Sequence, residues 1–559
     1  MPKQPETSDI LALYRHLNDT VWPKCHGKFE TIDSFIWGTF PVWTKPEHKD
    51  RPIWRPSTAA NIVAAASDNQ LAYVPKVHIV DIAESAVRKK RKELLENFLE
   101  AVFYDSSLME PVLPWKQLGK YLVTYGYGIV DGPRLDFTDK EEAEGEGNWN
   151  PFRIRAPHPS RILLDPTEKR PREGLKVWKE YAKDLEDLSL RKAKTPAEGR
   201  WVKEWYRPGE MSPYQTIDVM EYFSKDWHIL MTQAGEVIFV EPNTWGFCPF
   251  LHAFGGWGME TSSQDGASPE KQAVGILEWI QDTLKAQAQE WSSGHNLMMR
   301  QAWAPFGTTR APEEVAQQLA QDGILEGRKD DYWTLETLKV DDWMFRLGEK
   351  YAQDIEDGTF TKPIRGGREP GVTTMGQHAM QLQAAQRKFR PLQEQMNQMA
   401  TIVAQRILKL IEIYGEPLTV GGFKVKPEDV GKDYAVRVTF ELVDPVLQLQ
   451  AREVGMREVG MGLKSGITYR EHDLRIENEQ QEQERLYEDK LNQHPAVVEA
   501  GVEAIAKQKG MEEVIKRWEE QQELAAAGGA PGGGPGPGGL RQPLSEETTK
   551  PGQTMGMEG

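Results

Sequence analysis

Helical periodicity marks the first part of the chain. The stretches 8–23, 83–105 and 110–129 have the composition and apolar spacing of helices. In the second stretch, apolar residues recur every three or four positions, which is the pattern of a helix with one buried face; they are Leu94, Leu95, Phe98, Leu99 and Val102. We therefore expect three helices, of which the second packs one face into a core.

Alternating strands follow these helices. The stretch 150–169 has the proline and Asp-Pro punctuation of short strands separated by tight loops. The stretch 216–243 predicts two or three antiparallel strands, with Gln233-Ala234-Gly235 as a hairpin turn. Residues 1–267 are therefore predicted to form an α+β domain.

From residue 268 onward the pattern becomes mainly helical. Ser268-Pro269-Glu270 has the cap, the first-turn proline and the first-turn acid of a helix start. This predicts one helix over 268–303 and, after the cap Asp341-Asp342, a second helix over 341–357. The insert between them, 304–340, is predicted to hold a short helix and strands.

A glycine- and proline-rich loop is predicted over 358–372, because Pro363, Gly366, Gly367, Pro370 and Gly371 interrupt regular structure there. Thr373 or Thr374 then caps a predicted long helix that ends at Tyr414, with Gly415 as its stop and Pro391 as an internal kink.

The rest of the chain is predicted as one strand, a group of helices and a tail. Residues 434–445 alternate as a half-buried strand through Val436, Val438, Phe440 and Leu442. Helices are expected over 446–526. The glycine- and proline-rich 527–559 has too few apolar residues to offset its ordering entropy, so we expect a disordered tail.

Charge and chemistry narrow the functional classes. The chain has 559 residues and a formal net charge of −17, which argues against broad nonspecific wrapping of nucleic acid. Its two cysteines, Cys25 and Cys248, form no metal-ligand spacing and no disulfide framework. We find no phosphate-binding loop, no HExxH, no GxSxG and no apolar run long enough to span a membrane. We therefore expect no cofactor, no metal and no enzymatic activity, in a protein that is soluble and carries no visible export signal.

The order of these elements resembles the portal proteins of tailed double-stranded DNA bacteriophages. In that family an α+β wing leads into a stem helix, a small clip and a second stem helix, and then into a tunnel loop, a long kinked wing helix, a return strand and a helical crown. The matching segments here are 1–267 (wing), 268–303 (stem), 304–340 (clip), 341–357 (stem), 358–372 (tunnel loop), 373–445 (wing) and 446–526 (crown). The stretches "GREPGVTTMGQHAMQLQ", "GITYREHDLR", "PWKQLGKYLVTYGYGIV" and "PHPSRILLDP" are similar to portal sequences in the corresponding places. The family pattern assigns no role to the tail 527–559.

The resemblance implies a homo-oligomeric ring, usually a dodecamer, at one vertex of a virion capsid that is assembled in the host cytoplasm. Double-stranded DNA would be packaged and ejected through its channel. The partners implied are the terminase large subunit, which holds the ATPase, the major capsid or scaffolding protein, and head–tail adaptor proteins; no membrane is implied. Twelve copies of this chain would carry roughly −200 in charge, which would keep DNA phosphates from adhering to the wall.

Two groups of residues are candidates within that scheme. Lys362, Arg365 and Arg368 lie on the tunnel loop and would meet DNA, or would instead pair with acids of a neighbouring subunit. The clip would dock the terminase through charged residues, namely Arg310, Glu313, Glu314, Arg328, Lys329 and Asp330. A head–tail adaptor or helical scaffold is the alternative class, and an enzyme whose site the spacing hides is a third.

Overall fold

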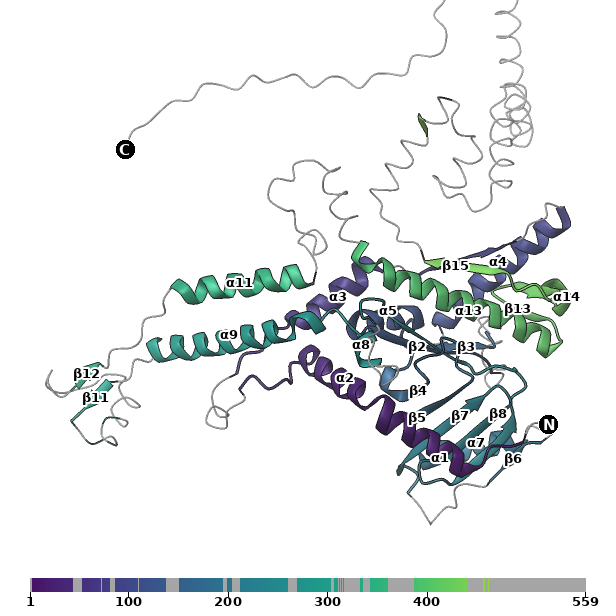
Figure 1. Cartoon of the computed structure of the whole chain (residues 1–559), viewed down its shortest axis with the longest axis horizontal. Coiled ribbons are helices and arrows are strands. Elements are labelled where there is room, and N and C mark those ends of the chain that lie inside the picture. Colours follow the sequence, from purple (N-terminus) through teal and green to yellow (C-terminus); the bar gives the residue numbers. More distant parts are fainter. Residues whose placement is uncertain are drawn as a thin grey trace, which may run out of the picture. The chain divides into compact units, whose positions relative to one another are not determined.

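The structure is a computed structural model of the whole chain, and it divides into two compact units, Met1–Leu447 and Gln448–Gly559. In the second unit it describes only residues 456, 457 and 461. In the first it describes residues 3–43, 53–71, 73–80, 86–108, 110–136, 150–194, 199–203, 212–259, 269–302, 306–309, 311, 313, 315, 332–334, 342–359 and 387–440. The predicted crown and tail therefore lie almost wholly outside the described residues, and the fold below is that of the first unit (Figure 1).

The predicted N-terminal helices are present. They are α1 (Thr7–Arg15), which continues through a π-helical turn into α2 (Pro23–Ile36), α3 (Thr58–Gln70), α4 (Ala86–Leu108) and α5 (Pro114–Tyr125). On α4 the predicted inner face is buried at Leu95, Phe98, Leu99 and Val102. The helix α5 ends at Gly126, which has a φ of +65° and therefore adopts the left-handed conformation that glycine tolerates best.

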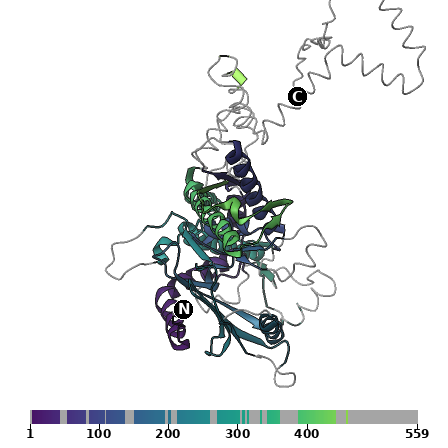
Figure 2. The same ribbon diagram turned by 90° about the vertical axis from the view of Figure 1, so that its right-hand side faces the viewer.

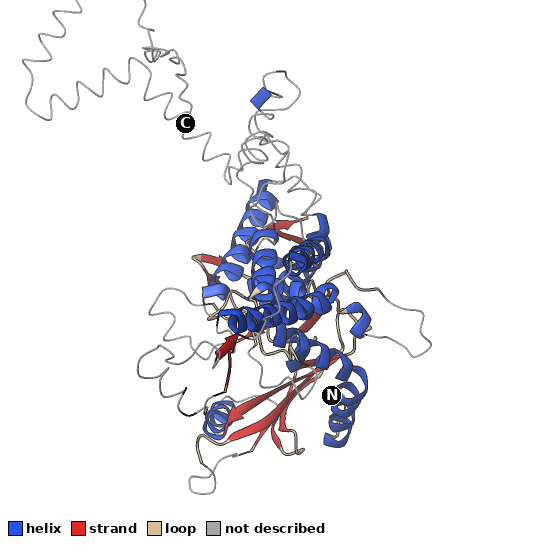
Figure 3. Ribbon diagram, turned by 90° about the vertical axis from the view of Figure 1, so that its left-hand side faces the viewer, coloured by secondary structure: helices blue, strands red, loops and turns tan. Residues whose placement is uncertain are grey.

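An antiparallel sheet of six strands forms the lower part of this unit. Its order is β4 (Ile162–Leu164), β5 (Glu173–Tyr181), β7 (Thr216–Ser224), β8 (Trp227–Thr232), β9 (Val237–Pro242) and β6 (Trp201–Val202). The hairpin between β8 and β9 turns at Gly235, with φ +94°, as the sequence predicted. The helix α7 (Ala182–Lys194) covers one face through Leu185, which is buried with Leu230 and Phe239. The turned views show these strands on one side of the main helical layer (Figures 2 and 3).

A second sheet joins the helices to that lower part. Its three antiparallel strands have the order β10 (Phe250–Phe254), β2 (Tyr127–Leu135) and β3 (Phe152–Arg155). The helices α5 and α13 (Arg390–Tyr414) both contact β2. Tyr127, Phe152 and Phe250 are fully buried there, so this sheet lies in the middle of the main hydrophobic core. The mixture of helices and antiparallel sheets agrees with the predicted α+β class.

The segment 268–303 is not the single helix that the sequence predicted. The structure has a four-residue helix α8 (Pro269–Gln272), a 3-10 turn (Glu278–Ile280) and then α9 (Gln281–Ala302). The helix is interrupted where the chain packs against the end of α5. There the Ile276 N–H donates to the carbonyl of Val123 at 2.8 Å. A Cβ at Gly275 would lie 1.8 Å from the Thr124 carbonyl oxygen, so only glycine fits this close approach.

The helix predicted over 341–357 is present as α11 (Asp342–Gly358), so Gly358 ends that helix and does not begin the loop. The long helix predicted over 373–414 differs from its prediction. Within the described residues, α13 begins at Arg390 after a 3-10 turn (Arg387–Phe389), and Pro391 occupies its first turn. Proline lacks an N–H, and first-turn N–H groups have no partner within the helix. Pro391 therefore fits the start of the described helix and does not kink it. Gly415 ends α13 in the left-handed conformation, as predicted. The predicted start at Thr373 or Thr374 lies outside the described residues.

The chain returns to its N-terminal part after α13. A hairpin of β13 (Leu418–Val420) and β14 (Phe423–Val425) leads through α14 (Pro427–Val430) to β15 (Val436–Phe440). The strand β15 pairs antiparallel with β1 (Pro75–Ile79), and Val436, Val438 and Phe440 are buried, which confirms the predicted half-buried return strand. The pairing partner β1 was not predicted. None of the helices in the described part of the chain is long and apolar enough to cross a membrane.

Candidate functional site

Two helices lie side by side and carry a small hairpin between their ends. The helix α9 contacts α11, and the chain between them forms β11 (Phe306–Thr308) and β12 (Tyr332–Thr334), which pair antiparallel (Figure 1). Leu284, Ala288 and Ile355 are buried on this pair. The helix α9 also exposes apolar side chains: Trp291 is 48% exposed, Met298 51% and Met299 46%.

Most of the predicted site residues lie outside the described part of the chain. Those are Arg310, Glu314, Arg328, Lys329 and Asp330 of the insert and Lys362, Arg365 and Arg368 of the loop. Glu313 is described and is exposed. Their predicted roles therefore stay predictions.

The two described ends of the segment 360–386, which carries the three loop cations, are tied together at one point. The Lys388 ammonium donates to the carbonyl of Gly358 at 3.0 Å and to that of Thr359 at 2.6 Å. It also lies 5.0 Å from the ring centroid of Trp279, and the indole of Trp257 donates to the Lys388 carbonyl at 2.9 Å. Burial lowers the pKa of Lys388. Lys388 thus caps the end of α11 and ties together the two described ends that flank residues 360–386.

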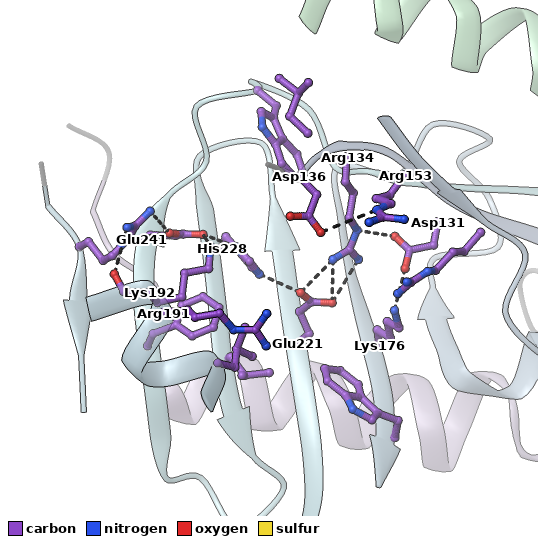
Figure 4. A pocket seen from close by; sticks show the side chains of 18 residues that line it. Asp131, Arg134, Asp136, Arg153, Lys176, Arg191, Lys192, Glu221, His228 and Glu241 are labelled. Carbon is purple, nitrogen blue, oxygen red and sulfur yellow. Dashed lines mark hydrogen bonds and ion pairs between the residues drawn. The ribbon is translucent and has the colours of Figure 1, made fainter. Parts of the chain in front are cut away.

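A cavity of about 560 Å³ lies where the three-stranded and six-stranded sheets meet. It is lined from β2, β3, β5, α7, β7, β8 and β9 (Figure 4). Polar and charged side chains line most of it, and several lie inside apolar strands, such as Glu221 within "VMEYF" and His228 within "DWHILM". Among the described residues this is the densest cluster of buried charge, so we treat it as a candidate site.

Arg134 is the centre of the first half of this network. Its guanidinium donates a hydrogen bond to Asp131 at 2.6 Å and further hydrogen bonds to both carboxylate oxygens of Glu221, at 2.9 and 3.1 Å. Lys176 bonds the other oxygen of Asp131 at 2.7 Å. Burial alone would raise the pKa values of Asp131 and Glu221, but the charge of Arg134, with further help from Lys176, holds both below their usual range. Because Arg134 comes from β2 and Glu221 from β7, the network fastens one sheet to the other.

His228 links this half to the second one. Its Nε2 lies 2.9 Å from Glu221 and its Nδ1 lies 2.7 Å from Glu241, so both contacts are hydrogen bonds only when both ring nitrogens carry a proton. Lys192 and Arg200 each lie 2.7 Å from Glu241. Against the effect of burial, His228 and Lys192 lower the pKa of Glu241 to about 2.

This arrangement is structural in character. Asp131 is held by Arg134 and Lys176, and Glu241 by Lys192 and Arg200. Glu221 is held by Arg134 and by the ring of His228, so none of the three carboxylates is left without a partner. Among the described residues no group of three or more His, Cys, Asp or Glu side chains could hold a metal ion. Cys25 and Cys248 are buried, and burial raises the pKa of each thiol to about 12, which leaves them protonated and unreactive. The sequence interpretation missed this network, although the charged residues inside apolar strands were a visible signal.

Comparisons with known proteins give no family. No family model matches the chain, and no curated protein matches it. Among solved structures, the neck of an empty gene transfer agent (GTA) particle, computed with C6 symmetry, is similar at a TM-score of 0.37 and 9% identity, covering 79% of this chain and 92% of the other. The virion of a native GTA particle is similar at a TM-score of 0.39 and 8% identity, with the same coverage. At TM-scores below 0.5 these two likenesses carry no functional argument.

Proposed function

We propose that this chain is a portal protein, a subunit of a ring at one capsid vertex through which double-stranded DNA is packaged and later ejected. The order of its described elements supports the proposal: an α+β region, two paired helices with the paired strands β11 and β12 between them in sequence, the helix α13 and a strand that rejoins the N-terminal part. The resemblance of the sequence to portal proteins rests on this same order of elements.

One observation carries the proposal. The pair α9 and α11 exposes Trp291, Met298 and Met299 on α9, where a lone chain would gain nothing from exposing large apolar side chains. A ring whose subunits meet through unlike faces would bury such a surface against the next copy. The hairpin β11–β12 at the end of the pair would then form one rim of the ring.

Native mass spectrometry of the full chain tests the assembly. We expect a closed oligomer, usually of twelve copies in the family that the sequence resembles. A stable monomer at micromolar concentration contradicts the proposal.

The loop cations have a proposed role within the channel. Lys362, Arg365 and Arg368 would contact phosphates of the passing duplex, and such contacts act on any sequence because they involve only the backbone. Changing all three to alanine should leave the ring intact and lower the yield of packaged DNA. If the variant packages normally and the ring loses thermal stability instead, the three cations are salt-bridge partners of a neighbouring subunit.

The insert 304–340 has a proposed role in docking the terminase large subunit. Exposed Glu313 belongs to the charged group that would make this contact, together with Arg310, Glu314, Arg328 and Lys329. The double change Glu313→Lys and Glu314→Lys should preserve the ring and abolish packaging. A head–tail adaptor, the alternative class, would instead form a ring that binds no terminase even before mutation. The capsid or scaffolding protein and the adaptors would be further partners of the portal.

A further inference from the structure

A groove runs beside α13, away from the charge network. It consists of two adjoining recesses of about 700 and 300 Å³ that share Arg170 and Ile402. Its walls are the β4–β5 connection, the exposed side of α13 and the strand β15, which contacts α13 (Figure 1).

The charge of this groove opposes that of the whole chain. The larger recess has three cations, Lys169, Arg170 and Arg437, and one acid, Glu394. The smaller has five cations and no acid: Arg170, Arg172, Lys225, Arg406 and Lys409. A chain with a net charge of −17 thus gathers seven cations against one acid along a single groove. Such a concentration raises the local density of anions.

Most of these cations have neutral partners. Lys169 donates to the side-chain oxygens of Gln395, at 3.0 Å, and Gln398. Arg170 donates to the side-chain oxygen of Gln405 at 3.1 Å. Glutamine oxygens orient the cationic side chains and leave their charge uncompensated.

Two of the cations do have acidic neighbours, and these two acids do not line the groove. Arg172 lies 3.4 Å from Glu168, with its own side chain 86% exposed, and Lys225 lies 3.9 Å from Asp226. Ion pairs this exposed contribute little energy and yield readily to a competing anion.

Arg406 is the most informative residue of the groove. It is only 8% exposed, yet its partners are the Pro249 carbonyl at 3.0 Å and the ring of Phe247, 4.6 Å away, and among the described residues no carboxylate pairs with it. Burial lowers the pKa of Arg406 to about 10, so it remains charged at neutral pH. A buried guanidinium without a carboxylate is costly unless an anion from outside completes it.

The kind of anion follows from the shape and composition of the groove. Its cations are spread along two connected recesses, which suits a line of charges better than one carboxylate. None of its lining residues is an exposed large apolar side chain, whereas the core of a protein–protein interface is normally rich in them. We propose that this groove binds the phosphate backbone of duplex DNA, independently of sequence. This surface goes beyond the channel proposed above and does not require it.

The test uses the full chain and a relaxed, covalently closed duplex minicircle, because a circle has no end that could thread into a closed ring. The groove variant carries Arg170→Ala, Arg172→Ala and Arg437→Ala, which are exposed positions. The matched control removes the same charge from exposed lysines outside the groove, with Lys179→Ala, Lys183→Ala and Lys194→Ala. Fluorescence anisotropy measures binding to two unrelated minicircle sequences at about 50 and 200 mM salt.

We expect the groove variant to bind both circles at least about tenfold more weakly at low salt, with a salt slope smaller by about 2 to 3. The lysine control and the loop variant at Lys362, Arg365 and Arg368 should bind the circles like the unmodified protein. A variant with lysine at the three arginine positions should keep most of the affinity, because a phosphate backbone responds mainly to charge.

Two results overturn the inference. Equal binding of the circles by the groove variant and the control excludes this groove as the DNA surface. A groove variant that binds DNA normally but fails to assemble shows that the groove instead receives an acidic surface of the next copy. Neither result bears on the channel, since the ring is tested separately by its mass.

Discussion

The charge network between the sheets and the groove beside α13 are built from the same residue types and differ in their partners. In the network, Arg134 holds two carboxylates, and Lys192 and Arg200 share a third. In the groove, Lys169, Arg170 and Arg406 are held by amide oxygens, a carbonyl and an aromatic ring. The network is complete within the chain, whereas the groove keeps its positive charge available for a ligand.

This difference separates a structural function from a binding function. Removing one member of a closed network leaves its buried partners with part of their charge unmatched, which is costly. Removing an arginine that has no carboxylate partner costs little folding free energy. It removes only the positive charge that the arginine presents to a ligand. The same kind of substitution should therefore act on stability in one region and on binding in the other.

The largest expected effect is that of Arg134→Met. The change leaves Asp131 and Glu221 buried without their shared guanidinium, so the free energy of unfolding should fall by about 3–5 kcal/mol. Urea denaturation of the full chain measures it, with Arg172→Met as the exposed control, which should change stability by under about 0.5 kcal/mol. A loss below about 1 kcal/mol for Arg134→Met would mean that the network contributes nothing specific.

The next effect is on pH dependence. The pKa of Glu241 is about 2 in the folded chain against 4.5 ordinarily, so the unfolded chain binds the proton first as pH falls. The stabilisation is complete above pH 4.5 and is lost toward pH 2, at about 1.4 kcal/mol for each unit of pKa difference. Unfolding free energies measured between about pH 6 and 3 should fall less steeply for Glu241→Gln than for the unmodified chain. Equal slopes would show that Glu241 has no such shift.

An intermediate effect is expected at the base of the loop segment. Lys388→Met keeps the aliphatic stem but removes the donor to the Gly358 and Thr359 carbonyls, at a cost of about 1.5–3 kcal/mol. The last turn of α11 should open more often, and hydrogen exchange at the Thr359 amide, which donates to Ile355, should become faster. Exchange along α13 provides the internal control. Unchanged exchange at Thr359 would show that Lys388 does not hold this end.

The smallest expected effect is that of Arg406→Met, the counterpart of Arg134→Met. The Pro249 carbonyl keeps a second donor, the Gly132 N–H at 3.2 Å, so the loss of Arg406 leaves no unsatisfied carbonyl. Replacing an unmatched buried charge with an apolar chain should leave the free energy of unfolding within about 1 kcal/mol or raise it. A loss comparable with that of Arg134→Met would remove the distinction between the two regions.

Local patterns predicted much of the fold. The inner face of α4, the Gly235 turn and the Gly415 stop were predicted because spacing and glycine chemistry act within a few residues. The break between α8 and α9 was missed, because it depends on the close approach of Gly275 to Thr124, about 150 residues earlier in the chain. The position of Pro391 in a first turn was missed for the same kind of reason. The 3-10 turn before it is held by contacts of Lys388 with Trp257 and Gly358, which are distant in sequence.

The candidate sites were harder to predict than the fold. Glu221 and Glu241 come together through the pairing of β7, β8 and β9, and Arg134 reaches Glu221 because β2 belongs to a second sheet that packs beside the first. The groove is also invisible in the sequence, since total charge gives no information on where the cations gather. Arg170 and Arg406 belong to one surface only through the packing of α13. The loop and insert residues, predicted from the resemblance, stay predictions.

The proposed portal assembly is tested most directly by cryo-electron microscopy of the purified full chain. We predict a closed ring with an axial channel, in which α9 and α11 of every copy lie along the channel and Trp291 is covered by the next copy. Particles that stay monomeric or form open clusters at micromolar concentration, or a ring in which Trp291 faces solvent, would contradict the account.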